Sequence, residues 1–363
     1  MVAKGAKGKE PSPQDFINDL LGAPIEFTGE QAARLAGLDP EWTLTLWRAL
    51  GFPHPGNEPY FTTKDVAALK DVSRLIDRGH LTPDQAIEVS RSFGQGTARM
   101  AEWVNNIMGR VFAERGVLPE NGMLVPGELG PLIQESMKIQ PAFHRLLVYT
   151  WRRQSVATVE RAIALMEVND EPTDVMSVGF ADLVGFTRLS REIDDADLAQ
   201  LVVDFEASAT DVVTANGSRL IKTIGDEVLF VNESAHDLAE TALALLAMSE
   251  QKEDLPQLRI GLATGSVVTR MGDVFGTTVN RASRLTAIAK PNSLLCDGET
   301  AEALESDEAF EVKSVRPRPI RGFGLMRSWT LSHAKVEKDS DKEKKKDKDK
   351  KDKGKDKEDK QSK

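Results

Sequence analysis

The sequence predicts an all-α domain near the amino terminus, a mixed α+β domain in the second half and a disordered charged tail at the carboxyl end. Three observations carry this prediction. Short helical patterns divided by Gly and Pro fill residues 14–145, and β-type runs alternate with helical patterns from residue 175 onward. After residue 333 the chain consists almost entirely of Lys, Asp and Glu. A length of 363 residues is sufficient for two or three domains.

Six short helices are expected in the amino-terminal domain, over 15–21, 28–36, 40–50, 63–78, 82–93 and 97–114. Polar residues that commonly cap helices precede several of them, at Thr28, Asp39, Thr62 and Thr82. Glycines are expected to end them at Gly37, Gly51, Gly79 and Gly94. Residues 1–13 are expected to be disordered, and a weak helical pattern over 146–170 predicts a linker helix.

The mixed domain is expected to span 171–333. Its β-type runs are VMSVGFADL, SRLIKTI, VLFVN, LRIGLA and SVVTR, and helical patterns lie between them over 197–215, 235–250 and 277–289. Strands that alternate with helices in this way predict a layered fold, with helices packed on a sheet. The single cysteine, Cys296, follows Leu294 and Leu295 and is expected in a buried strand, where no internal disulfide can form.

Charge and hydropathy exclude several classes of protein. The net charge is −10, and the 14 Lys and 10 acidic residues of 334–363 leave −14 on the remainder, which disfavours nucleic acid as the main partner. No apolar run reaches the roughly 18 to 20 residues of a membrane helix. No apolar segment follows the basic start of the chain, so a secretory signal is not expected and the predicted location is cytoplasmic.

Two acidic residues stand where predicted strands give way to loops. Asp182 ends an apolar strand, and Asp226 follows Gly225 in what the sequence predicts to be a tight hairpin turn. Alone, Asp226 is better explained as a turn residue. Together, the two carboxylates could bind Mg²⁺ or Mn²⁺, which prefer oxygen ligands and phosphates.

A second polar pair lies on the predicted helix over 277–289. Asn280 and Arg284 are four residues apart and therefore share one helix face, from which both could reach the same ligand. An isolated pair with this spacing is equally typical of an ordinary polar helix surface. Its significance depends on the motifs around it.

The segments GFADLVGFT, KTIGDEVLF and GDVFGTTVNRASR occur in this order between residues 173 and 333, and together they resemble the motifs of class III adenylyl cyclases. The resemblance implies an α+β ferredoxin-like catalytic domain that converts ATP to cyclic AMP and pyrophosphate. It implies that Asp182 and Asp226 bind two Mg²⁺ or Mn²⁺ ions per active site. It also implies that Asn280 orients the ribose and that Arg284 stabilises the transition state.

The resemblance assigns base recognition to Lys222 and Asp273. Adenine offers an N6 donor and an N1 acceptor, which an aspartate and a lysine complement, whereas guanine reverses this pattern. ATP is therefore expected as the substrate, and guanylyl cyclase activity is the alternative within the same chemistry. A site that pairs buried polar groups rejects mismatched ligands by factors that approach about 10⁴.

Three further residues are expected to bind substrate. Phe186 and Thr187 follow Gly185 at the start of a predicted helix, whose backbone N–H groups would face the phosphates. Arg321, in PIRGFG, stands where the family often has a lysine on the triphosphate, although a surface arginine explains it equally well. Because the family builds each site from two catalytic domains, the resemblance implies a homodimer with two equivalent sites.

Two interpretations of the amino-terminal domain remain open. The architecture resembles soluble bacterial cyclases in which a helical regulatory domain inhibits the catalytic domain in a pH-dependent manner, and His54, His80 and His144 are the titratable candidates there. Residues 27–93 also resemble a winged helix-turn-helix of the mercury-resistance regulator type, which would make the chain a DNA-binding regulator with a nucleotide-sensing domain.

The composition of the candidate recognition helix argues against DNA binding. Over 40–50 it carries only Arg48 as a cation, whereas DNA contacts usually use several basic residues. Trp42 and Trp47 on the same helix are expected to pack in the core or at an interface.

Overall fold

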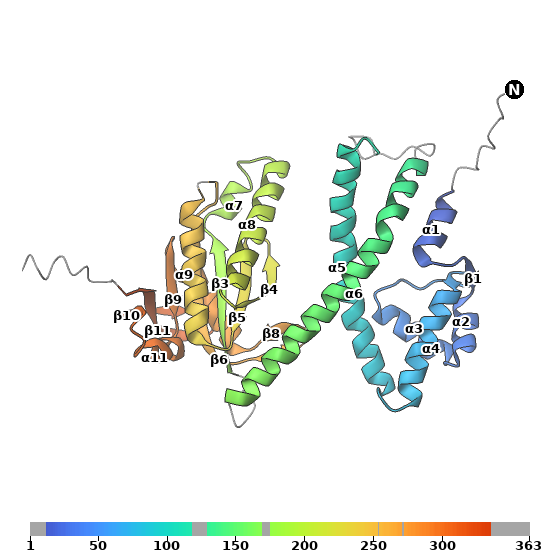
Figure 1. Ribbon diagram of the computed structural model, residues 1–363. Helices are drawn as coiled ribbons and strands as arrows, with labels where there is room; N and C mark the ends of the chain where they lie inside the picture. Colours follow the sequence, from blue (N-terminus) through green and yellow to red (C-terminus); the bar gives the residue numbers. More distant parts are fainter. Residues whose placement is uncertain (1–11, 118–128, 169–174, 253, 271, 335–363) are drawn as a thin grey trace, which may run out of the picture. The chain divides into compact units, whose positions relative to one another are not determined.

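A computed structural model describes residues 12–117, 129–168, 175–252, 254–270 and 272–334. The chain divides into two compact units, Met1–Ala164 and Leu165–Lys363, which we call the helical unit and the sheet unit (Figure 1). The predicted disordered segments, 1–13 and 334–363, lie almost wholly outside the described residues. In the described part of the chain, no helix combines the length and apolar character needed to cross a membrane.

Among its described residues, the helical unit contains six helices and a small sheet. Its helices are α1 (Pro13–Leu21), α2 (Gly29–Ala36), α3 (Pro40–Ala49), α4 (Thr63–Asp77), α5 (Pro83–Glu114) and α6 (Leu129–Val168). The expected N-caps are confirmed, because the side chains of Thr28, Asp39, Thr62 and Thr82 each accept a backbone N–H from the first turn of the following helix. The expectation of an all-α domain is wrong in one detail: β1 (Ile25–Phe27) and β2 (Phe61–Thr62) form an antiparallel pair.

Gly94 does not end a helix, contrary to the sequence prediction. The two helices expected over 82–93 and 97–114 are the single helix α5. A Cβ atom on Gly94 would lie 2.3 Å from the carbonyl oxygen of Leu50, so this glycine allows α5 to approach the end of α3. Gly37, by contrast, does end its helix, with a left-handed φ of 74°.

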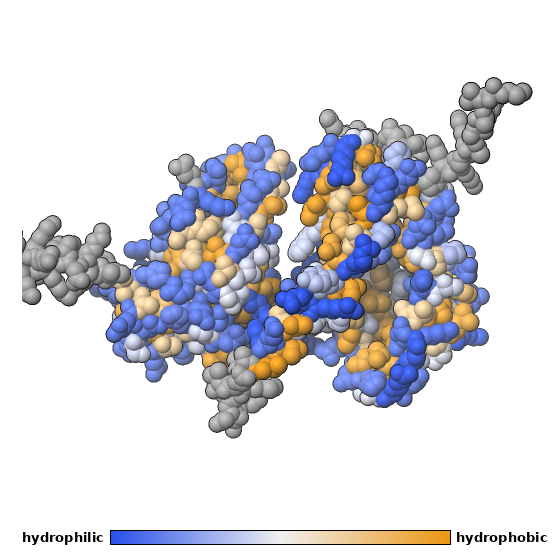
Figure 2. Space-filling model, viewed as in Figure 1, coloured by the Kyte–Doolittle hydropathy of each residue, from blue (hydrophilic) through white to orange (hydrophobic). Residues whose placement is uncertain are grey.

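The helix α6 begins well before the predicted linker and covers the end of 14–145 and most of 146–170. It contains Pro141 within its length. Large apolar side chains remain exposed along α5 and α6, and Figure 2 shows hydrophobic surface over these helices. The exposed residues include Trp103, Ile107, Leu146, Tyr149 and Trp151.

The sheet unit is built on a seven-stranded mixed sheet of order β10-β11-β9-β6-β3-β5-β4 (Figure 1). Adjacent strands in this sheet are antiparallel, except for β6 and β9, which are parallel. The strands are β3 (Val175–Leu183), β4 (Arg219–Ile224), β5 (Glu227–Asn232), β6 (Leu258–Ser266), β9 (Ser293–Cys296), β10 (Phe310–Ile320) and β11 (Gly324–His333). A separate hairpin joins β7 (Val268–Arg270) to β8 (Asp273–Phe275).

Helices cover both faces of this sheet. The helices are α7 (Phe186–Leu189), α8 (Asp195–Ala215), α9 (Ala235–Gln251), α10 (Thr277–Ile288) and α11 (Gly298–Leu304). Side chains from α8, α9 and α11 form the larger core with alternate residues of β3, such as Ala181 and Leu183. The opposite residues of β3, Val178 and Phe180, pack in a second core with Ala282 of α10.

The predicted strands and helices between residues 175 and 289 are confirmed, with small differences at their ends. The expectation for Cys296 is confirmed as well, because it is fully buried in β9. The predicted helix after Gly185 is the short helix α7, and the elements of this unit that the sequence analysis did not anticipate are β8, α11, β10 and β11.

Candidate active site

Three charged residues form one row across the centre of the sheet. In the antiparallel registers, Asp182 of β3 lies directly opposite Glu227 of β5 on one side and Arg259 of β6 on the other. Residues directly opposite one another in a sheet point to the same face, so all three share the face on which α10 packs. Arg259 forms an ion pair with Asp182, with 2.6 Å between Nε and Oδ2.

Asp226 is held beside this row by a two-residue turn. Ile224 and Glu227 are the last pair of the β4–β5 ladder, and Gly225 has the positive φ of 65° that the turn requires. The carbonyl oxygen of Asp226 accepts a hydrogen bond of 3.0 Å from the N–H of Leu183. The hairpin predicted from the sequence therefore forms, and it brings Asp226 to the end of β3, where its carboxyl group contacts that of Asp182.

Burial changes the titration of Asp182 and Glu227. Burial raises the pKa of Asp182, although the Arg259 guanidinium opposes the shift. Burial also raises the pKa of Glu227 to about 7, and the negative charges of Asp182 and Asp226 add to that effect. A cation placed between these groups would relieve this repulsion.

The donor set fits a hard divalent cation. Asp182 and Asp226 offer only carboxylate oxygens, which Mg²⁺ and Mn²⁺ prefer. Among the described residues, no three His, Cys, Asp or Glu side chains converge closely enough to hold a metal ion by themselves. Two protein carboxylates with the remaining ligands from substrate phosphates and water is the usual arrangement for Mg²⁺ at phosphate-transfer sites.

Lys222 and Asp273 meet although they are 51 residues apart in sequence. The Nζ of Lys222, on β4, lies 2.5 Å from Oδ2 of Asp273, on β8. A register shift in the β4–β5 ladder lies between Leu220 and Lys222, and such irregularities redirect side chains. The Phe275 ring lies 6.0 Å from the same ammonium group, and both charged side chains remain about one-third exposed or less, at 34% and 27%.

The helix α10 carries Asn280 and Arg284, and both are exposed. Close packing of α10 on the sheet depends on Gly261, where a Cβ atom would lie 2.3 Å from the backbone nitrogen of Thr286. The hydroxyl of Thr286 also donates to the carbonyl oxygen of Phe180 on β3. The helix that presents the two polar residues is therefore fixed to β3 and β6.

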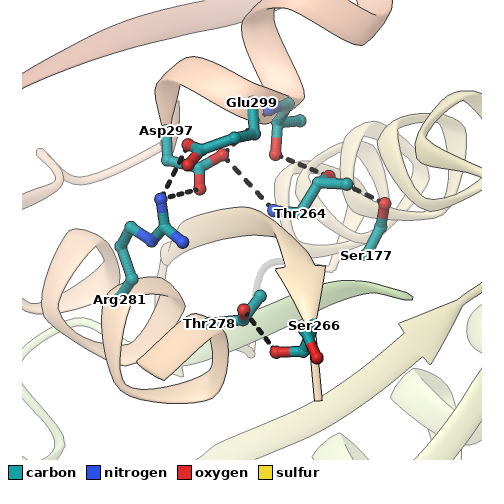
Figure 3. Close-up of polar contacts among 8 residues, drawn as sticks. Ser177, Thr264, Ser266, Thr278, Arg281, Asp297 and Glu299 are labelled. Atoms are coloured by element: carbon teal, nitrogen blue, oxygen red, sulfur yellow. Dashed lines mark hydrogen bonds and ion pairs between the residues drawn. The ribbon is translucent and has the colours of Figure 1, made fainter. Parts of the chain in front are cut away.

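The first half of α10 has its own anchor, shown in Figure 3. Arg281 points away from the exposed face of α10 and forms ion pairs with Glu299 at 2.7 Å and Asp297 at 3.1 Å. Asp297 is 1% exposed, and its Oδ1 caps α11 by accepting the N–H of Thr300. Its Oδ2 faces Arg281 without the alignment of a hydrogen bond, so this contact is an ion pair.

The remaining predicted residues are more dispersed. Phe186 is half-buried against the larger core and Thr187 is exposed, both in the short helix α7 that follows Gly185. Arg321 is exposed in the turn between β10 and β11. Because β9 and β6 separate β11 from β3, the sheet of one chain does not bring Arg321 into the row at Asp182.

The mixed sheet, the adjoining carboxylates and the Lys222–Asp273 pair together define a nucleotidyl cyclase catalytic domain of class III. Residues 168–333 match the family described as the adenylate and guanylate cyclase catalytic domain. An adenylate cyclase of Streptomyces coelicolor is 38% identical over 90% of this chain and 91% of its own length. One from Streptomyces griseus is 42% identical over 86% and 87%.

A protein of Mycobacterium tuberculosis named as a pH-sensitive adenylate cyclase is 32% identical over 79% of this chain and 72% of its own. The similarity to all three relatives thus extends through most of the chain, beyond the catalytic domain. The chain belongs to the class III adenylate cyclases.

Sequence reasoning did not find Glu227, Arg259 or Arg281. Arg259 left a usable signal, because it is the single charged residue within the apolar run LRIGLA. Its opposition to Asp182 depends on the strand register, however, which sequence periodicity alone does not supply. Arg281 lies between Asn280 and Arg284, where it was indistinguishable from a surface residue.

Proposed function

We propose that the sheet unit, a fold of the ferredoxin-like type, selects ATP through Lys222 and Asp273 and converts it to cyclic AMP and pyrophosphate. The observation that carries this proposal is the 2.5 Å approach of the Lys222 ammonium to the Asp273 carboxylate. A donor and an acceptor side by side match the N1 acceptor and N6 donor on one edge of adenine. Both groups are accessible enough to exchange their mutual contact for the base.

The remaining residues act on the ribose and the phosphates. Asp182 and Asp226 would hold two divalent cations, which lower the pKa of the ribose 3′-hydroxyl and neutralise charge on the leaving pyrophosphate. Asn280 orients the ribose so that its 3′-oxygen faces the α-phosphorus. Arg284 stabilises the negative charge that develops on the α-phosphoryl oxygens. The backbone at Phe186 and Thr187, and the side chain of Arg321, contact the phosphates.

The proposed active unit is a homodimer in the cytoplasm. Each site takes Asp182 and Asp226 from one chain and the residues on β4, β8 and α10 from the other, so a twofold axis generates two equivalent sites. The exposure of Asn280 and Arg284 supports this arrangement, because both side chains are free to meet a second chain.

An assay of cyclic AMP formation tests the proposal. Asp226→Ala is expected to reduce kcat with Mg²⁺ or Mn²⁺ by more than about 10³-fold. Glu302→Ala removes an exposed carboxylate on α11, which packs on the opposite face of the sheet from the row, and should leave the rate unchanged. Wild-type protein that forms no cyclic nucleotide with either metal between pH 5 and 8 would contradict the proposed activity.

Lys222→Ala tests base selection. The variant should lose about 10²-fold in kcat/KM for ATP, with a smaller change for GTP, because its pocket no longer donates to adenine N1. Rates on both nucleotides measure the ratio. A wild-type protein that prefers GTP would favour the guanylyl cyclase alternative.

The helical unit is proposed to inhibit the sheet unit in a pH-dependent manner. The similarity to a pH-sensitive adenylate cyclase over 79% of this chain supports the proposal, because it extends into the helical unit. Residues 171–333 alone should be several-fold more active than the whole chain at the inhibitory pH. Equal specific activities across pH 5.5 to 8 would show that the helical unit does not inhibit.

Packing in the helical unit argues against a base-stacking role for Trp47. Trp47 contacts the rings of Phe52, Tyr60 and Phe61, and its indole N–H donates to the carbonyl oxygen of Pro53. The expectation that Trp47 packs internally is therefore confirmed. A base-stacking role on DNA would require this ring to be free.

A further inference from the structure

Arg259 contacts both the metal carboxylate Asp182 and the helix that carries Asn280 and Arg284. We propose that it is a positioning residue that couples the two active sites of the dimer. The inference rests on the two-chain site proposed above, in which Asp182 of a given chain serves one site and α10 of the same chain serves the other. A shift of either group would then be transmitted to the second site through Arg259.

The contact with Asp182 is short and directed. Nε and Nη2 of Arg259 lie 2.6 Å and 2.5 Å from Oδ2 of Asp182. The two residues are directly opposed in the β3–β6 ladder, so their backbones fix the distance that the side chains must span. The guanidinium therefore constrains one oxygen of the carboxylate and leaves the other available.

The contact with α10 uses the remaining nitrogen. Nη1 of Arg259 donates to the carbonyl oxygen of Ala287 at 3.2 Å, in the last turn of the helix. Carbonyl groups in a last turn have no partner within their helix, and cations are favoured at that end. Gly261 and Thr286 already hold this turn against the sheet, so Arg259 and α10 can move little relative to each other.

A simpler role for Arg259 would be to neutralise the buried Asp182. That role requires only a positive charge, which lysine also provides. Joining a carboxylate to a helix carbonyl requires several donors held in a rigid plane, which lysine lacks. Arg259→Lys therefore separates the two roles.

Mixed dimers provide the decisive experiment. A chain with Asp226→Ala, purified with a differently tagged chain carrying Arg284→Ala, contains one site with all its residues. The Asp226→Ala chain supplies α10 to that site, and its own Asp182 belongs to the inactive one. Adding Arg259→Lys to the Asp226→Ala chain is expected to lower kcat of the mixed dimer about fivefold with little change in KM, because the substitution reaches the active site only through α10.

The same substitution on the other chain and a second arginine serve as controls. Arg259→Lys on the Arg284→Ala chain should also lower kcat, because that chain supplies Asp182 to the active site. Arg281→Lys weakens the other anchor of α10 and should act only when placed on the Asp226→Ala chain. An unchanged kcat with Arg259→Lys on the Asp226→Ala chain would overturn the coupling. Inactivity of the unmodified mixture would instead contradict the two-chain site itself.

Metal binding without ATP tests the contact at Asp182 independently of turnover. Arg259→Met should lower the Kd for Mn²⁺ about threefold or more, because it removes a cation next to the carboxylate. Arg281→Met should leave this Kd unchanged. Equal Kd values in wild type and both variants would overturn the role at Asp182.

Discussion

In the sheet unit, polar side chains are buried at the ends of strands and helices, whereas in the helical unit large apolar side chains remain exposed. Asp182, Asn232 and Asp297 are each less than 10% exposed in the sheet unit. Among the residues of the helical unit that the structure describes, the buried polar ones are Thr43, Thr62 and Ser90, all uncharged. Burying a polar group costs free energy unless the group is hydrogen-bonded or paired with an opposite charge. Buried charged groups are therefore expected where they serve a function. This comparison agrees with catalysis in the sheet unit, and we expect protein contacts to be made by the helical unit.

The largest expected effect comes from replacing one closely packed glycine in each unit, because only one of the two replacements should reduce catalysis. Gly261→Ala should cost about 3 kcal/mol in the free energy of unfolding and lower kcat more than about 10²-fold, because the new methyl group must displace α10. Gly94→Ala should cost a similar free energy in the helical unit without reducing kcat of the sheet unit. Denaturant unfolding and cyclic AMP assays on both variants measure the two effects.

Gly109→Ala is the matched control for Gly94→Ala. It lies in the same helix, and a Cβ atom there would meet nothing within 4 Å, so the variant should be neutral or slightly stabilised. Loss of turnover in Gly94→Ala would show that the catalytic rate depends on the packing of the helical unit, and would weaken the division of roles.

A smaller effect is expected at Asp297, which anchors Arg281. Burial raises the pKa of Asp297 to about 6, so the folded chain holds more protons than the unfolded chain between about pH 4 and 6. Stability therefore falls as pH rises through that window. Asp297→Asn removes this dependence. As pH rises from 4 to 7, the free energy of unfolding of the variant relative to that of wild type should therefore increase by about 2 kcal/mol. Parallel pH profiles of unfolding for the two proteins would contradict the shift.

The smallest expected effect concerns His236. A hydrogen bond to Asp307 raises the pKa of His236, so its contribution to stability is present in full below the unfolded pKa and is lost as pH rises through the folded pKa. His236→Gln should lower Tm by on the order of 1 °C at pH 5.5 and by less at pH 8.5. A Tm difference that grows with pH would reverse the assignment.

Local sequence signals predicted much of this chain. Capping residues such as Thr62 and Thr82, the strand ending at Asp182 and the turn at Gly225 each depend on a few neighbouring residues, and all of them formed as expected. Gly94 was misinterpreted because the same residue type serves helix ends and close helix contacts. Only the position of Leu50 distinguishes the two uses.

Contacts between residues far apart in the sequence limited how much of the candidate site could be predicted. The Lys222–Asp273 contact joins a sheet strand to a separate hairpin, and sequence reasoning grouped the two residues only through the family motifs. No motif led to Arg259, because its role follows from the registry of β6 against β3. A strand pattern identifies which residues share a face but not which residues on two strands are opposite.

The row Glu227–Asp182–Arg259 also limits how this protein can change in length during evolution. Inserting one residue before Arg259 in β6 would transfer Arg259 and Gly261 to the opposite face of the sheet. Asp182 would then lose its ion-pair partner, and α10 would lose the glycine against which it packs. The strand β10 already accommodates an irregularity between Val315 and Arg318. Insertions and deletions that natural selection retains should therefore accumulate at that outer strand, while β3, β5 and β6 keep a constant length.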